Sequence, residues 1–266
     1  MRQLRSKLLI SFLILVPIAF LTGIYDLQIS KFVVNQKSNW ARFLQNYGMI
    51  PGLFVIMSGI IIYYSHIKGK SNVWGYIQMV FLFLVNSGLT YYLFEIFLDR
   101  IVDDNLIFFL AISFAINLVV FLFIHKREQI TNLVLISYSK VVFRMAFFGY
   151  VIGVQAVKFF WGRVRFRELD ATYSQFTPWY LPQGITGFDS FPSGHAAMGW
   201  MLLAVLILFN KKKLSKNLVL ILIILWGILL ATSRVIIGAH FASDVLFGSF
   251  FIIVTFFYFR YKNSQN

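Results

Sequence analysis

The sequence predicts an all-α fold, a polytopic transmembrane helical bundle of about eight spans. The first observation is composition: 59% of the 266 residues are hydrophobic and 13% are charged, whereas soluble domains average about 45–50% apolar and about 25% charged residues. The second is that the apolar residues gather into runs as long as a membrane span. Because no linker, repeat or low-complexity tract divides the chain, we expect residues 1–266 to form a single integral membrane domain.

Eight stretches are candidates to cross the hydrocarbon core of a bilayer, which takes about 20 apolar residues in a helix. They are residues 8–25, 47–65, 73–95, 105–124, 138–158, 195–209, 217–235 and 240–259. The first follows a basic start without an evident cleavage site, so we expect an uncleaved anchor. The sixth is short. Asn86 and Asn117, inside the third and fourth stretches, are expected to hydrogen-bond between helices.

Membrane topology accounts for the formal net charge of +14, which would otherwise suggest nucleic-acid binding. With the N-terminus in the cytoplasm, the cytoplasmic segments hold 15 basic residues and one acid, Glu128. The other side holds the remaining nine basic residues and nine acids. Because basic residues near span ends concentrate in the cytoplasm, we expect a plasma-membrane protein with both termini inside. Membrane lipids, and no nucleic acid, are its expected partners.

Three polar clusters interrupt the apolar runs, all at span ends that this topology places outside the cell. They are residues 158–165, 192–195 and 233–244. The chain has no cysteine, which excludes disulfides, thiolate nucleophiles and cysteine-ligated metals. The catalytic motifs are therefore expected within residues 158–244, on the extracytoplasmic side.

The clusters contain the parts of a phosphate-binding site. Lys158, Arg165 and Arg234 supply cations, and the arginine fork can bind two phosphate oxygens at once. Residues 192–194 resemble a helix start with Ser193 at or near the N-cap. Amide groups and the helix dipole at such a start favour an anion, and Gly194 lets the backbone approach it closely.

Two histidines and one aspartate complete the set. His240 and Asp244 are four residues apart, so on a helix they lie on one face. A carboxylate that accepts one ring N–H fixes the histidine tautomer and leaves the other nitrogen to attack. His195 is then the group that can protonate the departing oxygen. Arg163, which flanks the first cluster, is expected at most to support these residues.

Taken together, the clusters resemble the type 2 phosphatidic acid phosphatase superfamily, which includes lipid phosphate phosphatases and vanadium haloperoxidases. The family pattern is Lys-x6-Arg-Pro, then Pro-Ser-Gly-His, then Ser-Arg-x5-His-x3-Asp. The residues that match it in order and spacing are Lys158, Arg165, Pro192, Ser193, Gly194, His195, Ser233, Arg234, His240 and Asp244. Phe166 stands in place of the family's proline, which leaves the local loop geometry open.

The resemblance implies a mechanism through a phosphohistidine, with no metal and no cofactor. His240 would attack phosphorus and His195 would protonate the leaving group. The groups that would hold the phosphoryl oxygens are Lys158, Arg165, Arg234, Ser193 and the amide of Gly194. Integral members have a six-span core with three spans before the first motif, whereas five are counted here, so an extra helical hairpin within residues 73–125 is expected.

The sequence therefore predicts a bacterial-type integral membrane phosphatase for a lipid phosphate or diphosphate. Substrates implied by the resemblance include undecaprenyl diphosphate, phosphatidylglycerol phosphate and phosphatidic acid. One alternative is a lipid phosphotransferase that uses the same phosphohistidine; another is a transporter built on degenerate catalytic parts, which the filled catalytic positions disfavour. The aromatic stretch 173–191 fits an interfacial belt or a lid, and the oligomeric state stays open.

Overall fold

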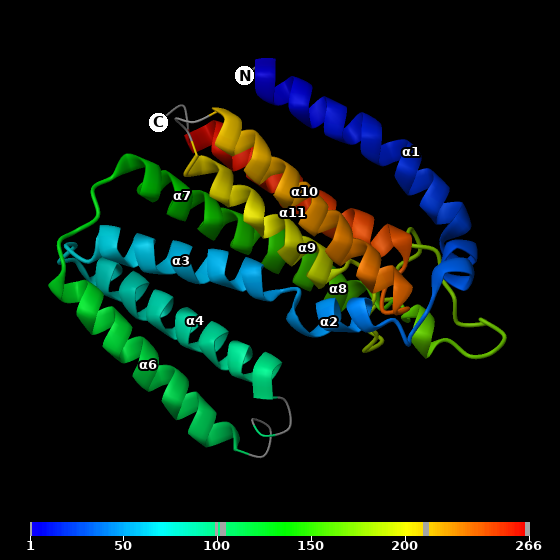
Figure 1. The fold of residues 1–266 in the computed structure, drawn as a ribbon, viewed down its shortest axis with the longest axis horizontal. Helices are drawn as coiled ribbons and strands as arrows, with labels where there is room; N and C mark the ends of the chain where they lie inside the picture. Colours follow the sequence, from blue (N-terminus) through cyan, green and yellow to red (C-terminus); the bar gives the residue numbers. More distant parts are fainter. Residues whose placement is uncertain (1, 99–100, 102–104, 210–212, 264–266) are drawn as a thin grey trace. The chain divides into compact units, whose positions relative to one another are not determined.

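The computed structural model describes residues 2–98, 101, 105–209 and 213–263 (Figure 1). Every regular element within these ranges is helical, which confirms the all-α prediction. The chain divides into two compact units, residues 1–52 with 144–266 (unit 1) and residues 53–143 (unit 2). Because these units are described separately, the expectation of a single membrane domain stays a prediction.

Unit 1 is organised around its last helix. Its helices are α1 (Arg2–Val33), α2 (Asn39–Tyr47), the start of α3 (Ile50–Ile67), α8 (Val157–Trp161), α9 (Gly194–Trp200), α10 (Lys213–Ile236) and α11 (Ala242–Asn263). A π-helical stretch, Met145–Ala156, precedes α8, and short 3₁₀ stretches occupy Phe166–Glu168 and Met201–Ile207. Helix α11 contacts α1, α9, α10 and the π-helical stretch, so it carries its N-terminal residues into the middle of the unit.

Unit 2 contains the rest of α3, then α4 (Val73–Leu98), α6 (Leu106–Lys126) and most of α7 (Leu133–Arg144). Helices α4 and α6 pack against each other, where the sequence predicted an additional hairpin. Asn86 Nδ2 donates to Asn117 Oδ1 at 2.5 Å, and Asn117 Nδ2 donates to Thr90 Oγ1 at 2.8 Å. The predicted bond between these helices is confirmed, as polar groups require where lipid offers no partner.

Seven helices of the described chain are long and apolar enough to cross a membrane, one fewer than predicted. The missing one is the predicted span 195–209, observed as α9 followed by the 3₁₀ stretch Met201–Ile207. At their usual rises these 14 residues reach about 25 Å, against a hydrocarbon core of about 30 Å. Together they are a short apolar helix, largely buried inside unit 1.

Helix α1 extends well past its predicted end at residue 25. Asp26 follows that predicted end, and the helix continues past it to Val33. Asp26 is completely buried, as is Ser30 four residues after it, and Thr22, four residues before it, is 7% exposed. Residues at this spacing share one helix face, so the end of α1 turns a polar face toward the rest of unit 1.

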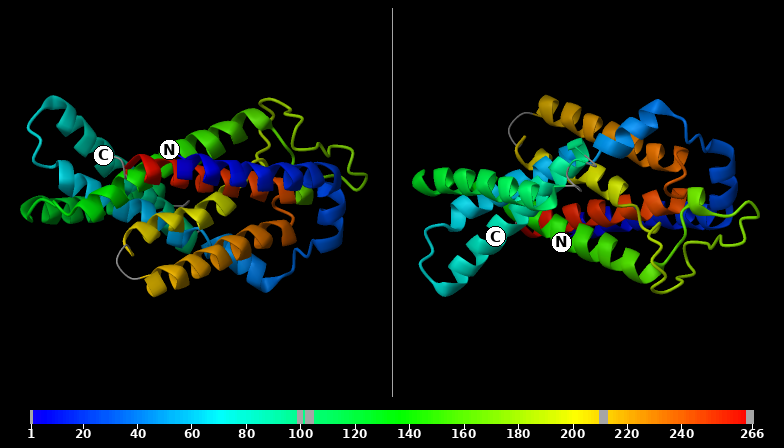
Figure 2. Two further views of the ribbon diagram at one scale, coloured as in Figure 1. Left: turned by 90° about the horizontal axis from the view of Figure 1, so that it is seen from above. Right: turned by 90° about the horizontal axis from the view of Figure 1, so that it is seen from below.

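The first turns of α1 and the last turns of α11 lie at one end of unit 1, and residues 162–193 lie at the opposite end (Figures 1 and 2). The three polar clusters of the sequence gather at this second end. The fold therefore places the candidate chemistry at the end of the helices away from both termini.

Candidate active site

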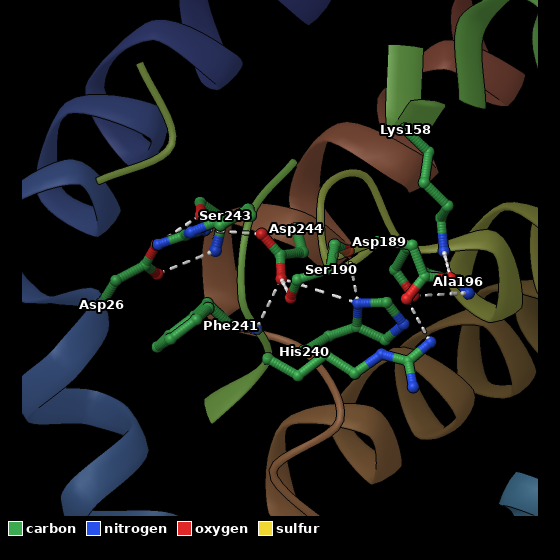
Figure 3. Close-up of polar contacts among 12 residues, drawn as sticks. Asp26, Lys158, Asp189, Ser190, Ala196, His240, Phe241, Ser243 and Asp244 are labelled. Carbon is green, nitrogen blue, oxygen red and sulfur yellow. Dashed lines mark hydrogen bonds and ion pairs between the residues drawn. The ribbon is translucent and has the colours of Figure 1, made fainter. Parts of the chain in front are cut away.

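Two cations of the first cluster meet at one carboxylate. Lys158 lies in α8, which Gly162 ends with a left-handed backbone conformation, φ +62°. Lys158 Nζ lies 3.5 Å from Asp189 Oδ2, and Arg165 Nη2 lies 2.5 Å from Asp189 Oδ1 (Figure 3). Arg165 also pairs with Glu168 at 3.2 Å. The sequence brought Lys158 and Arg165 together correctly but gave no role to Asp189.

The start of α9 adjoins the start of α11. Ser193 is the N-cap of α9, and its Oγ accepts from the amide of Ala196 at 3.4 Å, which confirms the predicted helix start. The amide of Ser193 donates to the Asp244 carbonyl oxygen at 2.9 Å. Gly248 of α11 faces the Ser193 backbone so closely that a Cβ there would collide with it. This glycine lets the two helix starts approach each other.

The tautomer of His240 is set by a backbone carbonyl. His240 is 2% exposed, and its Nδ1 lies 2.7 Å from the carbonyl oxygen of Ser190. Because that oxygen can only accept, Nδ1 carries the hydrogen and Nε2 carries the lone pair. Asp244 Oδ2 is further from Nδ1, at 3.6 Å. The prediction that the Asp244 carboxylate accepts the ring N–H therefore needs correction: Ser190 is the closer acceptor.

The expectation that His240 and Asp244 lie on one face of a helix is also wrong. Helix α11 begins at Ala242, so His240 lies in the loop that precedes it. That loop is tight because the amides of Ala239 and His240 both donate to the carbonyl of Arg234, at 3.0 and 3.2 Å. The loop, and not a shared helix face, brings the His240 ring near Asp244.

Both oxygens of the Asp244 carboxylate are bound by other residues in the protein interior. Its Oδ1 lies 2.6 Å from Arg163 Nη1, and its Oδ2 accepts from Ser190 Oγ at 2.5 Å and from the Phe241 amide at 2.8 Å. The residue is completely buried. Asp244 thus fixes Ser190, whose carbonyl in turn fixes His240 (Figure 3).

His195 lies in the first turn of α9 and is held from α2. Its Nε2 lies 2.9 Å from the carbonyl oxygen of Gln45, so Nε2–H donates there and Nδ1 is the nitrogen left for chemistry. Arg234, at the end of α10, is 5% exposed and shares the tight loop with His240. All eight site residues predicted from the sequence therefore lie at one end of unit 1.

The surroundings keep His240 neutral at ordinary pH. Burial lowers the pKa of His240 to about 4. The neighbouring Asp244 opposes this shift, whereas the cations Lys158 and Arg234 reinforce it. Below that pKa the ring would be protonated and unable to attack; above it, Nε2 keeps its lone pair.

Sequence reasoning underrated the residues that surround Asp244. Arg163 was expected to play a supporting role at most, yet it is 1% exposed and pairs with both Asp244 and Asp26. Asp26 was given no role, because it lies just beyond the predicted first span, residues 8–25. The signal that could have identified it is the four-residue spacing of Thr22, Asp26 and Ser30 inside an otherwise apolar run.

The aromatic stretch 173–191 packs partly inward. The indole N–H of Trp179 donates to the Ala19 carbonyl of α1 at 3.0 Å, and the Phe176 ring lies 5.4 Å from that of Phe241. Tyr180 and Phe188, by contrast, are 55% and 40% exposed. Two aromatic side chains of the stretch therefore anchor it to α1 and to Phe241, the residue after His240.

This arrangement has the parts that a phosphoryl-transfer site needs: a neutral buried histidine that could act as a nucleophile, three cations and a second histidine. Within the described ranges, no three His, Cys, Asp or Glu side chains are grouped to hold a metal ion. Stabilisation of phosphate charge can come instead from Lys158, Arg165 and Arg234.

Comparison with known proteins finds a family match for the C-terminal part of the chain. A sequence model described as the PAP2 superfamily matches residues 137–266, a range that contains all eight predicted site residues. Neither a curated protein nor a solved structure matches the chain.

Proposed function

The chain belongs to the PAP2 superfamily, and is thus a phosphoester hydrolase in general terms; from this premise we propose that it removes phosphate from a membrane lipid through a phosphohistidine. The observation that carries the proposal is the geometry of His240. Its Nδ1–H is held by the Ser190 carbonyl, which leaves the unprotonated Nε2 as a nucleophile beside the cations.

Binding of the phosphate is the first step. Lys158, Arg165 and Arg234 neutralise its charge, and the Ser193 hydroxyl and Gly194 amide donate to its oxygens. Because the Asp189 carboxylate pairs with two of these cations, the phosphate replaces it there. The groups are fixed before the substrate arrives, which is the condition for strong electrostatic stabilisation of the transition state.

In the second step, His240 Nε2 forms a bond to phosphorus while the bond from phosphorus to the lipid oxygen breaks. His195 Nδ1 passes a proton to that oxygen, so the lipid leaves as a neutral alcohol or, from a diphosphate, as the monophosphate. The proton arrives with the substrate, since a phosphate monoester loses its second proton only near pH 6. Nδ1–H, bonded to Ser190, holds the positive ring of the phosphohistidine.

Water completes the reaction. It gives a proton to His195 Nδ1 as its oxygen bonds to phosphorus, and the N–P bond breaks to return the lone pair to His240 Nε2. Phosphate takes this proton from His195 as it leaves, so that Nδ1 is again unprotonated, and Asp189 again pairs with Lys158 and Arg165. His195 thus serves as the acid in one half of the reaction and the base in the other.

The position of the site supports a lipid substrate. Seven helices of the described chain are long enough to span a bilayer, and the site lies at one end of the helices of unit 1. A phosphate head can therefore be bound at the interface while the hydrocarbon tail stays in the membrane. We place the site on the extracytoplasmic side of the plasma membrane, with a polyprenyl diphosphate, phosphatidylglycerol phosphate or phosphatidic acid as substrate.

The test is phosphate release by purified enzyme from a panel of these lipids. Wild type should release phosphate in the presence of EDTA, and vanadate should inhibit competitively. His240→Ala should abolish release, because removing a nucleophile costs orders of magnitude in rate. His66→Ala, a substitution in unit 2, is the matched control and should be fully active. Phosphate release by His240→Ala would refute the mechanism, and phosphate transfer to an added alcohol without free phosphate would assign a phosphotransferase instead.

A further inference from the structure

A carboxylate of the first helix is bound by residues from the C-terminal half of the chain. Asp26 belongs to α1 and is 0% exposed. Its Oδ2 lies 2.9 Å from Arg163 Nη2 and also accepts from Ser243 Oγ. Its Oδ1 accepts from the Ser243 amide at 2.9 Å. A buried carboxylate needs such partners to offset its lost hydration. Asp26 is therefore bound to the same segment that supplies Asp244.

Arg163 lies between two carboxylates and is bonded on every side. Nη2 contacts Asp26, whereas Nη1 contacts Asp244 Oδ1 at 2.6 Å and Ser243 Oγ at 2.8 Å. Nε donates to the Thr177 carbonyl at 2.9 Å, and the guanidinium lies 4.1 Å from the centre of the Phe241 ring. Because the guanidinium is planar and rigid, its partner at one edge determines which atoms its other edge can reach.

The chain of contacts continues to the nucleophile. Asp244 binds Arg163 through Oδ1, which leaves Oδ2 for Ser190 Oγ and the Phe241 amide. The Ser190 carbonyl holds His240 Nδ1. Figure 3 shows Asp26 on one side of His240 and Lys158 with Asp189 on the other. Asp26 is thus connected to the His240 ring through hydrogen-bonded neighbours. It lies away from Lys158, one of the cations proposed to bind phosphate.

We infer that Asp26 is a positioning residue of this site: through Arg163 and Ser243 it keeps Asp244 Oδ2 on Ser190, and so aims His240 Nε2 at phosphorus. The inference rests on the proposed phosphohistidine function. Without the Asp26 charge, Arg163 is free to bind both oxygens of Asp244, since a bidentate pair is the geometry that arginine and a carboxylate favour. Oδ2 would then leave Ser190, and the His240 ring would lose its fixed orientation.

A residue with this role affects the chemical step and leaves ground-state binding of phosphate unchanged. Misorienting a nucleophile slows the chemical step, whereas the cations that bind phosphate stay in place. Inorganic phosphate reports on the cations alone, and vanadate also requires a bond from His240 Nε2. Misorientation of the His240 ring should therefore weaken vanadate binding and leave phosphate binding unchanged.

The experiment compares Asp26→Asn with wild type, purified in the same detergent. The expected result is a fall in kcat and a parallel rise in the vanadate inhibition constant, each about 10–100-fold, as for other residues that orient a ligand from behind. KM and the phosphate inhibition constant should stay at their wild-type values. An unfolded fraction would lower kcat but could not change an inhibition constant, so it cannot imitate this pattern.

Two further variants complete the test. Thr22→Val, one turn before Asp26 on the same helix, removes a hydroxyl that bonds to the Ala19 carbonyl of its own helix and should behave as wild type. Ser243→Ala removes one bridge between Asp26 and Arg163 without changing charge. It should show the same pattern more weakly, and it carries the test if Asp26→Asn does not fold.

The outcomes distinguish the two proposals. If wild type releases no phosphate and binds no vanadate, the proposed function fails. If wild type is active, His240→Ala is inactive, and a folded Asp26→Asn or, in its place, Ser243→Ala retains the wild-type vanadate constant, the function stands and the role of Asp26 is refuted. A rise in the phosphate constant equal to that for vanadate would also refute it, because the defect would then lie in the cations.

Discussion

At the scale of single residues, the carboxylate of Asp189 pairs with two cations that are proposed to bind phosphate. It pairs with Lys158 and Arg165 at 3.5 and 2.5 Å, and its side chain is 46% exposed. A partly exposed ion pair contributes only about 0.2–1 kcal/mol. Asp189 can therefore keep the two cations aligned and still give way to a dianionic or diphosphate head.

We predict that Asp189→Asn strengthens binding at the phosphate site. Loss of the competing charge should lower KM and the phosphate inhibition constant by about two- to fivefold, the equivalent of one partly exposed ion pair. Glu168→Gln is the control, since Glu168 pairs with Arg165 alone and should change these constants less. Steady-state kinetics with added phosphate measures both. A weaker affinity for phosphate in Asp189→Asn would show that Asp189 supports binding and does not compete with it.

At the scale of elements, the site depends on how closely the starts of α9 and α11 approach. The Ser193 backbone lies against Gly248 and donates to the Asp244 carbonyl. One contact thus positions the N-cap that is proposed to bind phosphate relative to the helix that carries Asp244. A glycine is required at this position because any Cβ would meet backbone, which cannot move aside as a flexible side chain can.

We predict that Gly248→Ala loses both stability and activity. Overpacking costs about 1–3 kcal/mol, and the displaced Ser193 should lower kcat/KM. The matched control is Gly88→Ala on α4, where a Cβ would meet none of the described atoms within 4 Å; the better helix former should stabilise it by up to about 1 kcal/mol. Thermal unfolding and phosphate release test the pair. Equal behaviour of the two variants would contradict this account of Gly248.

The elements that the sequence predicted well are those whose signal is local. Apolar runs located the long helices, and the motif spacing brought together at one site eight residues that lie in or beside α8, α9, α10 and α11. The spacing did not reveal that Ser190 is the closest acceptor for His240, because that bond joins residues 50 positions apart. Asp26 was missed for the same reason: its partner Arg163 is 137 positions away.

At the scale of the whole molecule, the fold agrees with the charge pattern of the sequence. In unit 1 the first turns of α1 and the last turns of α11 share one end, and residues 162–193 occupy the other (Figure 2). The basic excess near the termini favours the cytoplasm for the first end. We therefore propose that residues 162–193 face the outside, together with the proposed phosphate site.

We predict opposite accessibility for two introduced cysteines. Because the chain has no cysteine of its own, single substitutions give no background. Gln183→Cys, exposed in the loop over the site, should react with a membrane-impermeant maleimide in intact cells. Asn217→Cys, exposed near the start of α10, should react only after the cells are permeabilised. The reverse pattern would place the active site in the cytoplasm.

The bond between Asp26 and Arg163 also sets a limit on modularity. Similarity to the family begins at residue 137, so a chimera assembled at that border would inherit every motif residue together with a foreign first helix. Such a graft would accommodate the Arg163 guanidinium only where the donor helix offers an acid at the place of Asp26. The structural unit around Arg163 therefore includes the first helix and is larger than residues 137–266, which the family model matches.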